Sequence, residues 1–113
     1  MKPDDISTYL NLTEALIITD KPAEAEEAAR QALKLAQSTE DKALSNYLLA
    51  ISLKLQGKDT RVLDEELERL CAEEFKAEWS FEEIEDWLKE AEISPECQVY
   101  IRQKTEMLKR HGE

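Results

Sequence analysis

Few side chains in this 113-residue chain are suited to catalysis or to metal binding. The single histidine, His111, lies two residues from the C-terminus, where we expect it to be frayed and solvated. A metal site would need a second imidazole, and the chain has none. Cys71 and Cys97 are 26 residues apart, which fits no zinc or redox motif. We expect two reduced thiols that act as small core residues, with a disulfide between them as the alternative.

Carboxylates are abundant, and pairs such as Glu65 with Glu66 could in principle supply a general acid and a general base. So many acidic residues are more typical of solvated helix faces than of a catalytic dyad. The two glycines are too few to form a phosphate-binding loop. The sequence therefore predicts a protein that is not an enzyme, with no catalytic residues, no metal and no cofactor.

The charge excludes further classes of function. The chain has 26 acidic and 15 basic residues, and residues 59–96 alone contain 15 acids against 4 bases. Nucleic-acid binding depends on Lys and Arg patches, so it is disfavoured. The longest apolar stretch, residues 47–53, is too short to span a membrane, and the N-terminus does not resemble a secretory signal. These features favour a cytoplasmic protein, and Met1 favours a complete chain.

The spacing of apolar residues predicts a single all-α domain of about six antiparallel helices. Apolar residues recur at three- and four-residue steps along nearly the whole chain, and only 2 Gly and 3 Pro interrupt it. The third expected helix, which ends before Gly57, is apolar on almost every side, so we expect it to be central. The expected helix starts are marked by Asp4, Pro22, Ser38 or Thr39, Ser80 and Ser94.

The fifth expected helix has the most detailed start signal. Ser80 followed by Glu83 matches a capping box, and Trp79 before it could pack on Ile84 as a hydrophobic staple. The residues expected on its inward face are Ile84, Trp87, Leu88 and Ala91.

An internal repeat relates the first two helix pairs. A shift of 37 residues places Leu12 on Leu49, Leu16 on Leu53, and the turn at Asp20 on the turn at Gly57. After that turn one extra residue is needed, and the alignment continues with Ala25 on Leu63, Ala29 on Leu67 and Ala32 on Leu70. A helix-turn-helix unit that recurs at this period indicates a solenoid.

These units resemble the tetratricopeptide repeat (TPR) family. Ala25 and Ala32 stand at the family's small packing positions, Leu12 and Leu49 at its leucine, and Gly57 in its mid-repeat turn. At the family's aromatic positions this chain has Leu16, Leu53, Ala29 and Leu67 instead, and the proline that closes a repeat is missing. The resemblance implies a TPR-like solenoid of two to three units, with a plain helical bundle as the alternative. It places two units in residues 4–75 of a single domain, 1–113. Residues 79–110 form a helix pair that is a degenerate unit or a cap.

The resemblance implies a non-enzymatic protein-protein interaction module. In that family the first helix of each unit lines a concave groove, which takes a peptide or a helix of a partner protein. Tyr47 would be the natural anchor of such an interface. Some members of the family bind a C-terminal carboxylate with a Lys/Asn cluster, which this groove lacks, and Glu14 would repel such a carboxylate. We therefore expect the bound segment of the partner to be apolar or basic. The expected groove residues are Leu10, Asn11, Glu14, Ile17, Tyr47, Leu48, Ile51 and Lys54.

The alternative function rests on charge instead of on a groove. The acidic block at residues 59–96 would suit a small inhibitor, decoy or chaperone that covers a basic surface of a partner. The two hypotheses differ in where substitutions should weaken binding.

Overall fold

The computed structural model describes residues 5–112, whose regular elements are all helices, and this confirms the predicted all-α class. Asp4, expected to cap the first helix, lies outside the described residues. Asp5 caps it instead, because its carboxylate accepts a hydrogen bond from the Ser7 amide at 3.0 Å. The helices are α1 (Ile6–Ile18), α2 (Pro22–Leu35), α3 (Thr39–Leu55), α4 (Arg61–Cys71), α5 (Glu82–Glu90) and α6 (Pro95–Lys109), followed by a short 3₁₀ turn, η1 (Arg110–Gly112).

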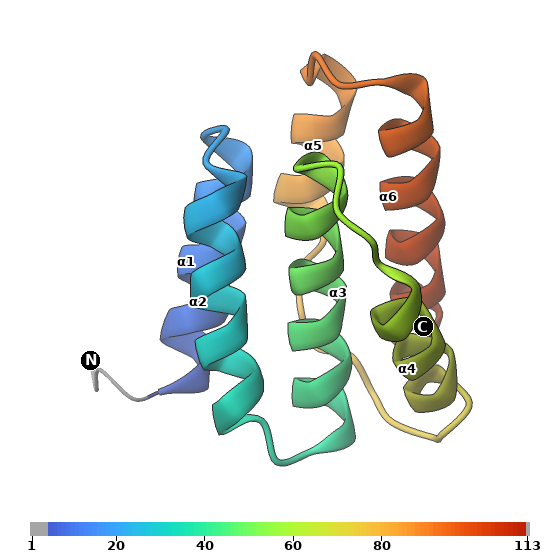
Figure 1. The fold of residues 1–113 in the computed structure, drawn as a ribbon. Coiled ribbons are helices and arrows are strands. Elements are labelled where there is room, and N and C mark those ends of the chain that lie inside the picture. The colour runs from blue at the N-terminus through green and yellow to red at the C-terminus, as the bar shows by residue number, and fades with distance from the viewer. Residues whose placement is uncertain (1–4, 113) are drawn as a thin grey trace.

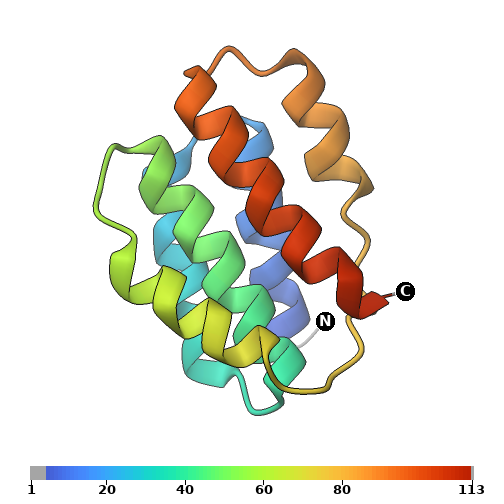
Figure 2. The ribbon, with the colours of Figure 1, turned by 90° about the vertical axis from the view of Figure 1, so that its right-hand side faces the viewer.

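The helices are arranged around α3. Helices α1 and α2 form an antiparallel hairpin beside α3, and α4 packs on the other side of α3 (Figure 1). Helix α6 runs alongside α3, as Figure 2 shows, and α5 contacts α1. The last helix pair therefore lies across the face that α1 and α3 form together.

The central position expected for the third helix is confirmed. Every residue from 43 to 53 of α3 is buried, including the polar Ser45 and Ser52. Ser52 satisfies its hydroxyl by donating to the Leu48 carbonyl at 2.9 Å, within the helix itself. A helix that is apolar on nearly all sides needs neighbours on all sides, and α1, α2, α4 and α6 supply them.

Local signals fixed most helix ends as expected. The hydroxyls of Ser38 and Ser94 accept hydrogen bonds from the amides of Asp41 and Cys97, at 3.1 and 3.2 Å. Each interaction satisfies one of the otherwise unpaired amides of a first helical turn.

The start expected for the fifth helix was wrong. Helix α5 begins at Glu82, with Phe81 at the capping position, and Ser80 makes only a long contact of 3.4 Å to the Glu82 amide. Phe81 is buried, and its ring packs edge-on against Tyr47 with ring centroids 5.6 Å apart. This long-range aromatic contact positions the chain before α5, and a local capping pattern cannot anticipate it.

The 37-residue shift relates two helix ends with the same geometry. Asp20 has φ 63° and Gly57 has φ 73°, both in the left-handed region. The amide that follows each of them donates back to a leucine carbonyl, from Lys21 to Leu16 at 2.8 Å and from residue 58 to residue 53 at 2.9 Å. Both α1 and α3 therefore end in the same left-handed hydrogen-bonded turn.

The connection between α4 and α5, residues 72–81, is held by the C-terminal turn. The Ala77 amide donates to the His111 carbonyl at 3.0 Å, and the imidazole of His111 stacks on Phe75 with ring centroids 3.9 Å apart. The expectation that His111 is frayed and solvated was therefore wrong. Its partner, Phe75, lies in the connection, far away in the sequence.

Within residues 5–112, no helix combines the length and the apolar character needed to cross a membrane.

Candidate protein-binding surfaces

Most of the expected groove residues are buried. Asn11 is exposed and Lys54 is partly buried, whereas Glu14 is only 9% exposed. The buried members belong to α1 and α3, which contact each other, and α5 packs on α1 while α6 packs on α3. The buried apolar members of the set are Leu10, Ile17, Tyr47, Leu48 and Ile51.

Tyr47, the expected anchor of the interface, is inaccessible in this arrangement. Its side chain is 0% exposed, and its hydroxyl lies 2.7 Å from the Thr105 hydroxyl of α6. Thr105 in turn donates to the Ile101 carbonyl at 2.7 Å, so the Tyr47 hydroxyl is the donor in the first bond. Burial raises the pKa of Tyr47, which keeps this hydroxyl protonated. Helix α6 thus occupies the place expected for a partner helix.

Lys54 is also held by α6. Its ammonium group lies 3.1 Å from a carboxylate oxygen of Glu96 and 5.1 Å from the ring centre of Tyr100. The Tyr100 hydroxyl donates to Asp64 of α4, and burial together with this bond raises the pKa of Tyr100. The end of the expected groove is therefore closed by polar contacts as well as by packing.

Glu14 is a buried carboxyl group with one oxygen, Oε2, that no described residue satisfies at ordinary hydrogen-bond geometry. Within the described residues, its Oε2 atom and the nearby Trp79 Nε1 atom form no hydrogen bond of ordinary geometry. Burial raises the pKa of Glu14 to about 7, the charge of Glu83 on α5 adds to this, and the Trp79 indole opposes it. Glu14 therefore sits at the junction of α1 with α5 and its preceding connection.

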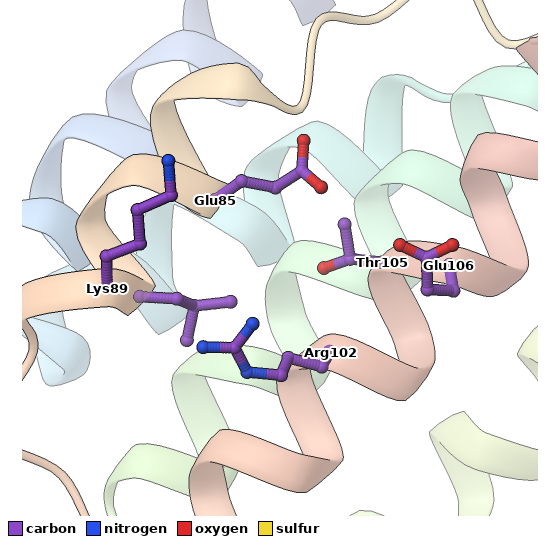
Figure 3. Close-up of a pocket in the computed structure, with 6 residues that line it drawn as sticks. Glu85, Lys89, Arg102, Thr105 and Glu106 are labelled. Atoms are coloured by element: carbon purple, nitrogen blue, oxygen red, sulfur yellow. The ribbon is translucent and has the colours of Figure 1, made fainter.

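A polar crevice of about 250 Å³ separates α5 from α6 (Figure 3). Glu85 extends from α5 toward α6, and Arg102 extends from α6 toward α5. Its lining mixes both charge signs with the Thr105 side chain, and Lys109 bridges the two helices by an ion pair with Glu85 at 2.8 Å. The arrangement is that of a packed helix pair with a polar outer seam.

A wider hollow, of about 590 Å³, lies where the end of α1 meets α5. Its apolar lining includes Ile18 and the partly buried Trp87. Trp87, which was expected on the inward stripe, is partly buried and packs against the hydrophobic core, and it also borders this open surface. The charged residues that line the hollow are the exposed acids Glu83, Asp86 and Glu90.

The acidic block forms an exposed surface that extends over α4, α5 and the connection between them. Several of its carboxylates form no ion pair with any residue in the range 5–112, so their charge is not neutralised within that range. These exposed acids are Glu65, Glu68, Glu74, Glu78, Glu82, Glu83, Glu90 and Glu92. We call this set the acidic surface.

Two features of these surfaces have a signal in the sequence but were not predicted from it. Glu14 lies four residues after Leu10 and three before Ile17, so it shares their inward face, and its burial could have been inferred. Trp87 is flanked by Asp86 and followed by Glu90, a pattern that places an aromatic ring beside acids on one helix. The role of Phe81 had no local signal.

Groups that could support metal or thiol chemistry do not cluster. Among the described residues, no three His, Cys, Asp or Glu side chains are placed to hold a metal ion. Cys71 and Cys97 are free and partly buried, and burial raises the pKa of the Cys71 thiol.

Comparisons with known protein families, with curated proteins and with solved structures give no match for this chain.

Proposed function

We propose that this chain is a non-enzymatic protein-binding module that meets a basic surface of a partner protein through its acidic surface. The observation that carries the proposal is a contrast between two faces. The face of α1 and α3 is filled by the chain's own C-terminal helices, whereas the acidic surface is exposed and its carboxylates are unpaired within residues 5–112. Long-range attraction between such a surface and a basic partner speeds association.

The hollow at Trp87 is the best anchor point on this surface. A tryptophan that is partly buried offers a large apolar area, and its ring face attracts the cationic groups of Lys and Arg. The exposed carboxylates of Glu83, Asp86 and Glu90 surround it. A segment that carries Arg or Lys beside an apolar residue would satisfy both parts of the hollow at once.

We further propose that residues 5–71 form a TPR-like pair of hairpins and that the protein works in the cytoplasm. The hairpin proposal is supported by the repeated helix end at Asp20 and Gly57 and by the contact of α1 with α3. The cytoplasmic proposal is supported by two free cysteines.

The test compares two variants that make the same change in net charge. Glu68→Lys combined with Glu90→Lys alters the acidic surface, and Glu24→Lys combined with Glu106→Lys alters exposed acids elsewhere. The wild-type chain is used to capture partners from a cell extract, which are identified by mass, and association kinetics are then measured for each variant. We expect the first variant to slow association by about tenfold or more, and salt at about 0.5 M to do the same.

The control variant should associate as fast as the wild type at equal salt. Equal association rates for both variants, or binding that does not respond to salt, would show that the acidic surface is not the contact.

Binding in the groove between α1 and α3 is the second candidate, and one observation favours it. The chain's own α6 packs on Tyr47 and Lys54 of this face, which supports a helix as the kind of partner that it would bind. A partner helix would then have to displace α5 and α6, and its binding would make the amides of α6 exchange faster with solvent. Protection of α6 that is unchanged in the complex would exclude this mode.

A further inference from the structure

The outer face of α1 is an apolar surface that no element within residues 5–112 covers. Leu12 is 45% exposed, and Tyr9 and Leu16 beside it are only partly buried. Together with α2 they line a hollow of about 350 Å³, to which α2 contributes Ala28 and the polar Glu24, Glu27 and Gln31. This face lies on α1 away from the buried Glu14 and is separate from the acidic surface.

The equivalent face of α3 shows what covers such a surface. The 37-residue shift relates Leu12 to Leu49 and Leu16 to Leu53, and these two residues of α3 are 1% and 7% exposed. They form a buried cluster with Ala29 of α2, and Leu33 of α2 packs against the same cluster. Helix α3 therefore receives α2 on this face, whereas the equivalent face of α1 receives no helix within residues 5–112.

A polar contact accompanies this packing and has its own equivalent. Lys58, just after α3, forms an ion pair with Glu26 of α2 at 2.9 Å, and Gln56 donates to the same carboxylate oxygen at 2.9 Å. These contacts lower the pKa of Glu26 to about 2. The same shift relates Lys58 to Lys21, which follows the identical turn after α1, is exposed and has no ion pair within the described residues.

We propose that the outer face of α1 binds a helix of a partner protein that packs as α2 packs on α3. The partner helix would present a small residue and a leucine four positions later to Leu12 and Leu16, as Ala29 and Leu33 do on α3. An acidic residue three positions before the small residue would pair with Lys21. The partner is thus a helix of the pattern acid-x-x-small-x-x-x-Leu.

The probe is a peptide with the sequence of residues 21–36, acetylated and amidated at its ends. A hydrocarbon staple joins the positions of Glu27 and Gln31, because isolated helices of this length are marginal in water. At 100° per residue, these two positions lie opposite Ala29 and Leu33, so the staple leaves the contact stripe free. The peptide is titrated into the full-length, ¹⁵N-labelled chain, and amide chemical shifts are followed by NMR.

We expect shift changes confined to residues 9–21 and to the neighbouring outer side of α2. Leu12→Lys should weaken the affinity of the chain for the peptide by at least about tenfold and leave the melting temperature of the chain unchanged. Val62→Lys is the matched control, because Val62 of α4 is 79% exposed and lies elsewhere, and it should leave binding unchanged. A peptide with Leu33→Glu probes the same contact without altering the protein, and it should not bind.

Three results would overturn the proposal. The first is the absence of any shift up to about 2 mM peptide. The second is a set of shifts centred on α3, which would mean that the peptide replaces the chain's own α2. The third is self-association of the chain that Leu12→Lys abolishes, since the occupant of the face would then be a second copy.

Discussion

Replacing Glu14 with glutamine should make the protein more stable at neutral and alkaline pH. The carboxyl group is 9% exposed, and its Oε2 atom has no hydrogen-bond partner among the described residues. The neighbouring groups give it no positive charge: Glu83 of α5 is acidic, Trp79 is neutral, and Tyr47 stays protonated. Burial therefore favours the neutral acid in the folded state and raises the pKa of Glu14 to about 7.

The size and sign of the effect follow from the two pKa values. In the unfolded chain the pKa of Glu14 is near its ordinary value of 4.5, whereas in the folded chain it is about 7. The folded state binds the proton more tightly, so the contribution of Glu14 to the free energy of unfolding falls as pH rises from 4.5 to 7 and is constant above that range. At about 1.4 kcal/mol per pH unit, the loss amounts to roughly 3 kcal/mol.

The other strongly shifted carboxyl group acts in a different pH range. The contacts of Glu26 with Lys58 and Gln56 lower its pKa to about 2. Its contribution is complete above pH 4.5 and is lost as pH falls toward 2. The effects of Glu14 and Glu26 therefore lie on opposite sides of pH 4.5, and a titration of stability can separate them.

The assay is urea unfolding followed by far-UV circular dichroism at pH 5 and at pH 8. The variant Glu14→Gln keeps the size of the side chain and removes its titration. It should exceed the wild type by roughly 2 to 3 kcal/mol at pH 8 and by much less at pH 5. The exposed Glu27→Gln on α2 is the control, and its effect should stay within about 0.5 kcal/mol at both pH values. A difference between Glu14→Gln and the wild type that is equal at pH 5 and pH 8 would refute the reasoning.

The remaining predictions concern helix ends. Asp20→Gly should stabilise the fold by about 0.5 to 1 kcal/mol, because Asp20 has φ 63°, a conformation that glycine adopts without strain. Gly57→Ala should destabilise it by about 1 kcal/mol for the same reason, since an added Cβ there meets no atom within 4 Å and only the backbone is strained. Thermal melts measure both variants, and changes in stability of the same sign would contradict the shared geometry. Ser94→Ala should cost about 1 kcal/mol, whereas Ser80→Ala should cost less than about 0.5 kcal/mol because its amide contact is long. Urea unfolding decides this pair, and an equal loss from both would mean that Ser80 does cap α5.

The parts of the fold that sequence could predict are those with local causes. The caps at Ser38 and Ser94 and the turn at Gly57 depend on residues within a few positions of one another. The central place of α3 follows from the apolar residues that this helix carries on nearly every side. The start of α5 could not be predicted in the same way, because Phe81 packs on Tyr47, 34 positions earlier in the chain.

The candidate groove shows the same division between local and long-range causes. Helical periodicity correctly placed residues such as Leu10, Ile17 and Ile51 on an apolar face. It could not say what covers that face, because an apolar stripe fits a partner helix and the chain's own helix equally well. The contacts that decide the matter, such as Tyr47 with Thr105, join residues 58 positions apart. Neither residue alone carries a signal for the other.

Coverage of the groove changes the energetics of the two candidate functions. A partner that uses the face of α1 and α3 can bind only when α5 and α6 have moved away, so its apparent affinity is reduced by the fraction of molecules that are open. If docking of this helix pair contributes about 4 kcal/mol, the reduction is about a thousandfold. Raising the pH above 7 charges Glu14, which would weaken the docking and lessen this penalty. A partner that binds the acidic surface on α4 and α5 needs no such opening. For this reason we place the leading site there, although the sequence pattern pointed first to α1 and α3.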